Sequence, residues 1–220
     1  MIYRNIDTLF IDLDNTLWDE SKLNEKIRET VDENLLEKVP KYINQEIELN
    51  GYYTWTNVFN YIGINYCDLI TKHVSQVYPY PKTIETLTLL QKTYSLWLVS
   101  DAGLDYTQLK LDILGLTLFF DGIITSDQTK TMKSNPDWWT KAIKISKKFQ
   151  DRIVVIGDSK NDIIPTSELG ILSIYVGKSE SLSFRLPKRV VHCSSFAQVP
   201  LKLNNIIRRN NEVKNLPFTC

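Results

Sequence analysis

Two aspartates near the start of the chain could do chemistry. Asp12 and Asp14 follow residues 6–11, an apolar run typical of a strand buried on both faces. Residues two apart in an extended chain point the same way, so both carboxylates should reach the carboxyl end of that strand, where open α/β sheets bind ligands. The two negative charges repel each other, and a bound cation would relieve this repulsion. Carboxylate oxygens are hard ligands, which favour magnesium (Mg2+) as that cation. The alternative is a turn in which Asp14 and Asn15 only bond the backbone.

Polar side chains follow further apolar stretches downstream. The candidates are Ser100 and Asp101 after residues 95–99, Lys133 ahead of Pro136, and Asp158 and Asp162 after residues 153–156. Taken singly, Ser100 is an ordinary strand-end serine and Lys133 an ordinary surface lysine. The pair Asp158 and Asp162 is stronger evidence for a functional site, because a turn after the strand would not by itself require a second carboxylate one helical turn later.

The elements that would position these residues alternate between helix and strand. We expect strands at residues 6–11, 96–99, 122–125, 153–156 and 172–176, and helices at 83–92, 104–114, 136–148, 162–169 and 196–208. Such alternation implies parallel strands joined by right-handed crossovers. The predicted fold class is α/β, a doubly wound parallel sheet.

One segment interrupts this alternation and predicts an inserted helical domain. Residues 22–38 have the pattern of an amphipathic helix that Pro40 ends, and two shorter helices are expected at 55–62 and 67–77. Aromatic side chains in this segment are interpreted mainly as its own core, with substrate contact as the alternative. The predicted domains are a core of residues 1–18 and 78–220 and a small helical domain of residues 19–77.

Composition narrows the choice of partner. Lysine plus arginine equals aspartate plus glutamate at 26 each, so no overall basic field would recruit nucleic acid. No apolar run reaches membrane-spanning length, and residues 1–5 leave no room for a signal peptide before the first strand. These features predict a cytoplasmic protein, monomer or homodimer, with a small metabolite as partner and neither nucleic acid nor membrane. The three cysteines are isolated and are interpreted as incidental thiols.

Taken together, the four polar stretches resemble the signatures of the haloacid dehalogenase (HAD) superfamily. In order along the chain, they are Asp12-Leu13-Asp14-Asn15-Thr16-Leu17, Ser100, Lys133 with Pro136, and Asp158 with Asp162. The chain departs from the family pattern at Asn15, where many relatives carry glycine, at Asp101, where asparagine is common, and at Ser134, which replaces a proline. The place of residues 19–77 is similar to that of the family's helical cap, so the resemblance implies a Rossmann-like HAD core with an inserted cap.

The resemblance also implies catalytic roles. Asp12 would attack phosphorus and form an aspartyl-phosphate, and Asp14 would protonate the leaving oxygen and then accept a proton from water. Ser100 and Lys133 would hold the transferring phosphoryl group, with a backbone amide at Asp101 completing the cradle.

A metal site follows from the same resemblance. Mg2+ would be bound by Asp12, Asp158 and the backbone carbonyl of Asp14, while Asp162 would hold either the metal shell or Lys133. The implied activity is magnesium-dependent hydrolysis of a small phosphate monoester. A sugar phosphomutase, which uses the same nucleophile, and a non-catalytic binding protein are alternatives. Dehalogenase activity is disfavoured because that branch lacks the second acid.

Overall fold

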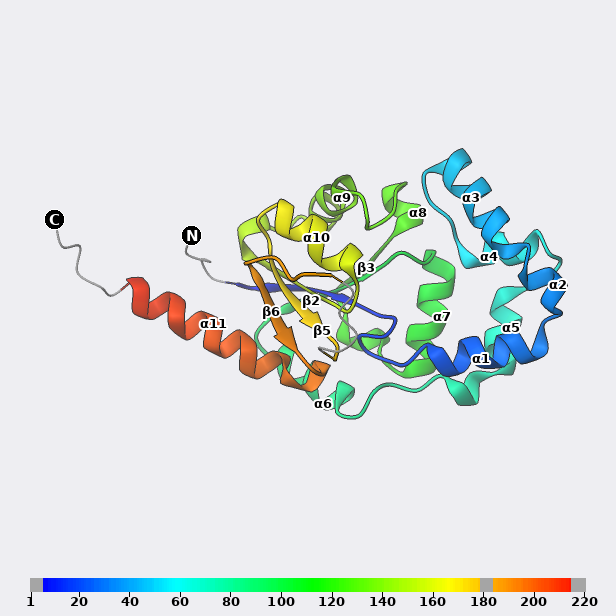
Figure 1. Ribbon diagram of the computed structural model, residues 1–220. Coiled ribbons are helices and arrows are strands. Elements are labelled where there is room, and N and C mark those ends of the chain that lie inside the picture. The colour runs from blue at the N-terminus through cyan, green and yellow to red at the C-terminus, as the bar shows by residue number, and fades with distance from the viewer. Residues whose placement is uncertain (1–5, 179–183, 215–220) are drawn as a thin grey trace.

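A computed structural model describes residues 6–178 and 184–214, which contain a six-stranded sheet (Figure 1). Its strands lie in the order β3-β2-β1-β4-β5-β6, and every neighbouring pair is parallel. They are β1 (Thr8–Asp12), β2 (Ser95–Ser100), β3 (Gly122–Thr125), β4 (Ile153–Gly157), β5 (Leu172–Val176) and β6 (Val190–Cys193). This confirms the predicted α/β class and five of the strands; β6 was not predicted. The first five residues, on which the signal-peptide expectation rested, lie outside the described residues.

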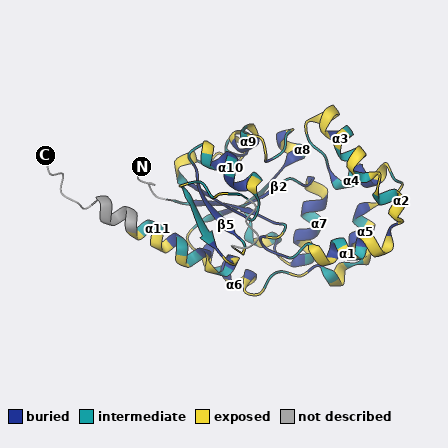
Figure 2. Cartoon of the chain, viewed as in Figure 1, coloured by how far each residue is buried: buried dark blue, intermediate teal, exposed yellow. Residues whose placement is uncertain are grey.

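Helices cover both faces of the sheet. Along β1, Leu9 and Ile11 face one hydrophobic cluster and Phe10 faces another, as alternation in a strand requires. The first cluster includes side chains of α6 (Thr83–Leu90), α7 (Leu104–Leu114) and α11 (Val199–Lys214). The second includes α9 (Pro136–Ser146), beside which lies α10 (Lys160–Glu168), and α8 (Ser126–Thr129) precedes α9. All of β1 is buried (Figure 2), and β1 lies between β2 and β4, so its last residue lies centrally at the carboxyl edge of the sheet.

The inserted segment forms five α-helices and a short 3-10 helix (Val74–Gln76) at one end of the molecule (Figure 1). The α-helices are α1 (Ser21–Thr30), α2 (Glu33–Leu36), α3 (Val39–Asn50), α4 (Trp55–Asn60) and α5 (Tyr66–Lys72). The two connections to the sheet lie side by side, because Trp18 bridges to Pro79 and the N–H of Tyr80 donates to the carbonyl of Leu17 at 2.9 Å. The chain therefore leaves the core and returns to it at one place.

The predicted helix over residues 22–38 was wrong in its extent. The chain becomes extended at Val31, and Asp32 then caps the short α2 by accepting the N–H of Asn34 at 2.8 Å. Pro40 does not end a helix; it stands in the first turn of α3. Proline is tolerated there because the first N–H groups of a helix have no intrahelical acceptor.

Start and stop signals elsewhere acted as predicted. Asn135 caps α9 by accepting the N–H of Asp137 at 3.0 Å, and Pro136 follows at the first helical position. α7 ends at Gly115, whose φ of 68° lies in the left-handed region that glycine adopts without strain. None of the helices within the described ranges has the length and apolar character needed to cross a membrane.

Candidate active site

Asp12 ends β1 in a buried position with two hydrogen-bond donors. Its residue surface is 7% exposed. Oδ1 accepts from Lys133 Nζ at 2.5 Å, and Oδ2 accepts from Thr16 Oγ1 at 3.1 Å. Burial raises the pKa of Asp12 above its ordinary value, Lys133 opposes this, and the neighbouring carboxylates of Asp162 and Asp158 add to it. A cation beside Asp12 would therefore favour the ionised, nucleophilic form.

Lys133 is buried at the centre of the site. Its Nζ donates to Asp12 and, at 2.8 Å, to Asp162 Oδ1. Burial lowers the pKa of Lys133, but the carboxylates of Asp12, Asp162 and Asp101 outweigh that effect and raise it, so the side chain is a fixed cation. Its backbone is fixed too, because its carbonyl accepts from Trp139 Nε1 at 2.9 Å. The interpretation as an ordinary surface lysine does not hold.

Three carboxylates gather at this edge of the sheet. One oxygen each of Asp12, Asp158 and Asp162 lies within 4.8 Å of the others. Burial and the charge of Asp162 raise the pKa of Asp158 to about 7. The hydroxyl of Thr16 lies between two of the acids, 3.5 Å from Asp158 Oδ1. An all-oxygen donor set with this mutual repulsion fits a hard divalent cation such as Mg2+.

Asp162 has other partners within this cluster. Its Oδ1 accepts from Lys133, while its Oδ2 accepts from Ser159 Oγ at 2.6 Å and from the Ser159 N–H at 3.2 Å, which caps α10. A Cβ placed on Gly157 would lie 2.5 Å from the Asp162 carboxylate, so only glycine fits beside it. Of the two roles open to Asp162, these contacts favour holding Lys133.

Asp14 faces a second lysine. Its Oδ1 accepts from Lys110 Nζ and, at 2.8 Å, from Trp18 Nε1. Directly after Asp14 the backbone turns at Asn15, whose φ of 61° is left-handed; asparagine tolerates this region better than most residues, as glycine does. Each of the two predicted acids thus has its own lysine.

Sequence reasoning missed Lys110, although a signal was present. The buried residues of α7 recur at helical spacing and are Tyr106, Thr107, Lys110, Leu111 and Leu114. A lysine in such a stripe is almost never fully buried unless it is paired. The pattern could therefore have indicated a buried cation, but not its partner.

Ser100 and Asp101 lie where β2 ends beside β1. Asp12 is opposite Val99 in the register, so Ser100 is the next residue toward the site. Ser100 Oγ accepts the N–H of Ala102 at 3.1 Å. Asp101 Oδ1 accepts the N–H of Lys133 at 2.7 Å and the hydroxyl of Ser126 at 2.9 Å. The Asp101 carboxylate therefore anchors the segment that carries Lys133.

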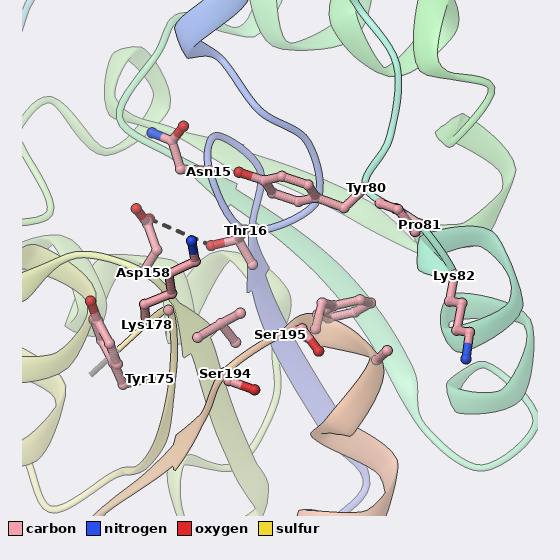
Figure 3. A pocket seen from close by; sticks show the side chains of 14 residues that line it. Asn15, Thr16, Tyr80, Pro81, Lys82, Asp158, Tyr175, Lys178, Ser194 and Ser195 are labelled. Atoms are coloured by element: carbon pink, nitrogen blue, oxygen red, sulfur yellow. Dashed lines mark hydrogen bonds between the residues drawn. The ribbon is translucent and has the colours of Figure 1, made fainter. Parts of the chain in front are cut away.

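A cavity of about 570 Å³ opens beside Asp158 and Thr16 (Figure 3). Aromatic rings of Tyr80, Tyr175 and Phe196 line it, coming from the returning connection, β5 and the turn after β6. Figure 3 shows Asp158 and Thr16 along one side of this space. The cavity gives a small molecule room next to the carboxylate cluster.

The family of the chain follows from the site residues and their order. The profile of the haloacid dehalogenase-like hydrolases matches residues 9–176, which include every predicted site residue. The chain belongs to this hydrolase family. The HAD resemblance of the four signatures is thereby confirmed.

Curated relatives of this HAD chain carry phosphatase names. Pyrophosphatase PpaX of Halalkalibacterium halodurans is 28% identical over 48% of this chain and 49% of its own length, and PpaX of Oceanobacillus iheyensis is 28% identical over 73% and 78%. Glyceraldehyde 3-phosphate phosphatase of Methanocaldococcus jannaschii is 33% identical over 51% of each. The chain thus spans about half the length of two of these relatives.

Solved HAD structures share the fold. A HAD phosphatase from Thermococcus onnurineus aligns over 90% of this chain and 97% of its own with a TM-score of 0.73 at 21% identity. L-2-haloacid dehalogenase from Xanthobacter autotrophicus aligns over 90% of this chain and 98% of its own, with a TM-score of 0.69 at 16% identity. HAD-hydrolase YfnB from Bacillus subtilis, bound to magnesium, aligns over 91% of this chain and 100% of its own, with a TM-score of 0.65 at 17% identity. At these identities the likeness concerns the fold.

Proposed function

We propose that this HAD chain hydrolyses a small phosphate monoester with Mg2+ through an aspartyl-phosphate on Asp12. The observation that carries the proposal is the buried cluster in which Lys133 contacts both Asp12 and Asp162 while Asp158 lies beside them. The phosphatase names of the curated relatives support the reaction class.

In the first step, an Asp12 oxygen forms a bond to phosphorus while the bond from phosphorus to the ester oxygen breaks. The leaving oxygen takes a proton from Asp14, so the alcohol departs neutral. Ser100 and the Lys133 cation hold the phosphoryl oxygens and stabilise the charge that develops on them. Asp162 keeps Lys133 in place.

In the second step, water attacks the phosphorus of the aspartyl-phosphate and gives a proton to Asp14. The bond from phosphorus to Asp12 breaks, inorganic phosphate leaves, and both aspartates return to their starting forms. Asp12, Asp158 and the backbone carbonyl of Asp14 would hold Mg2+, which would neutralise phosphoryl charge when bound. We further propose residues 19–77 as the cap that reads the substrate, because this segment leaves and re-enters the core at one place.

The test is phosphate release from a panel of small phosphate esters, with Mg2+ or EDTA, by the wild type and Asp12→Asn. We expect release that requires Mg2+ and that falls by more than about 10²-fold in the variant, because a carboxamide cannot replace the nucleophile. Asp137→Asn, on the exposed start of α9, is the matched control and should retain activity.

Release that persists in Asp12→Asn, or in EDTA, would contradict the proposed mechanism. Conversion of a sugar phosphate to its isomer without phosphate release would instead identify a phosphomutase. Analysis of the products by phosphorus NMR distinguishes the two outcomes.

A further inference from the structure

The side chain of Lys110 is completely buried, and its charge is directed at Asp14. Its Nζ pairs with Asp14 Oδ1 and lies 3.8 Å from Glu20 Oε1. The ring of Tyr106 lies 4.0 Å from this nitrogen and that of Trp18 lies 5.3 Å from it. A buried ammonium group requires such partners, because an unpaired one would lose its hydration without compensation. The surrounding groups therefore fix the ammonium group in place.

Both donors act on one oxygen of Asp14. Lys110 and Trp18 donate to Oδ1, and among the described residues none donates to Oδ2. The carboxyl group is therefore restrained in rotation, with one oxygen bound and the other left for a reacting group. Lys110 comes from α7, a helix that carries none of the four HAD signatures.

We propose that Lys110 is a positioning residue, which with Trp18 orients Asp14 for proton transfer to the leaving group. This inference rests on the proposed phosphatase function and assigns to that site a residue outside its four signatures. A proton donor is effective only when its oxygen lies within hydrogen-bond reach of the atom that receives the proton. Lys110 acts through Asp14, and substrate chemistry at phosphorus does not involve it directly.

The experiment compares two esters on Lys110→Met, whose side chain is close in length to lysine but uncharged. The alcohol of an alkyl phosphate such as glycerol 2-phosphate is a poor leaving group unless it receives a proton, whereas p-nitrophenolate departs from p-nitrophenyl phosphate without one. We expect kcat/KM for the alkyl ester to fall at least about tenfold more than kcat/KM for p-nitrophenyl phosphate, since general acid catalysis is worth roughly 10²–10⁴-fold. The parameter kcat/KM reports the step in which the leaving group departs.

Controls separate positioning from folding. The ratio of the two kcat/KM values does not depend on the fraction of folded protein, because both are measured on one preparation. Asp14→Asn should show the same selective loss, and Lys141→Met, a partly exposed lysine paired with Asp137, should leave the ratio unchanged. If Lys110→Met is insoluble, Trp18→Phe, which removes the second donor to Oδ1 and keeps an aromatic ring, decides by the same ratio.

An unchanged ratio in the soluble variant, with both activities reduced equally, overturns the inference and leaves the phosphatase function standing. An unchanged ratio in Asp14→Asn overturns it as well, because Asp14 would then not be the acid. A wild type that releases phosphate from no ester of the panel, these two included, overturns the proposed function and the inference together.

Discussion

Ionisation of the Glu20 carboxyl group destabilises the folded chain. Burial and the charge of Asp14 raise its pKa from 4.5 to about 7, against the opposing effects of Lys110, the Tyr106 hydroxyl and Asn24. Tyr106 also contacts Tyr66 of α5, so the group lies where α5, α7 and the first connection meet. Between these two pKa values the folded state binds one proton more than the unfolded state.

The contribution of Glu20 to stability should therefore fall as pH rises from about 4.5 to about 7 and become level above that. We expect the free energy of unfolding in urea to decrease by roughly 1–3 kcal/mol over this interval. Glu20→Gln should make the decrease smaller and leave the part due to Asp12 and Asp158, whose pKa values burial also raises, whereas Glu29→Gln, whose partner Lys26 is exposed, should follow the wild type. Parallel profiles for wild type and Glu20→Gln would refute this.

Single residues of the site were predictable to the extent that their signals are local. Asp12 and Asp158 each follow an apolar strand within a few residues, and Lys133 was recognised as a site residue because Pro136 follows it three positions later. The contact between Lys110 and Asp14 joins positions 96 residues apart, so no local pattern contains it. The burial of Lys133 was missed for the same reason, since its partners lie far away in the sequence, Asp12 at the end of β1 and Asp162 on α10.

At the level of elements, the capping of α9 matters because this helix begins just after Lys133. Asn135→Ala removes the acceptor for the Asp137 N–H, and we expect a loss of about 0.5–2 kcal/mol in the free energy of unfolding. Asn135→Asp should retain most of the stability, because aspartate caps equally well. Urea denaturation measures both variants; equal losses would show that the cap does not matter.

Elements with strong end signals were predictable, and those without were not. The helix over 104–114 and the strands over 122–125 and 172–176 match the structure residue for residue, since Gly115 and the apolar runs mark them. β6 is a four-residue edge strand that is mostly half-buried, so its pattern is weak. In α3, proline in the first turn was misread as a stop.

At the level of the whole molecule, the cluster of three acids destabilises the metal-free protein. In EDTA, Asp158→Asn should raise the Tm, because removing one charge relieves the repulsion from Asp12 and Asp162. Mg2+ should stabilise the wild type by about 2.7 kcal/mol at one hundred times its Kd and the variant by much less.

Differential scanning calorimetry in EDTA and in Mg2+ measures both effects. Asp137→Asn, on the exposed start of α9, is the control that should respond to Mg2+ as the wild type does. An equal response of Asp158→Asn and wild type to Mg2+ would mean that Asp158 is not a ligand.

The central place of β1 also has a kinetic consequence. Thr8 pairs with Ser95 on one side and with Ile153 on the other. The chain leaves the ribosome from its amino end, so β1 has no partner until β2 has been synthesised. Its other edge then stays unpaired until β4 has been synthesised. Such distant parallel pairs close slowly, because loop entropy is lost before contacts are gained. The strand that ends in Asp12 is made first and enclosed late, and until then it keeps an unpaired edge that other nascent chains can reach.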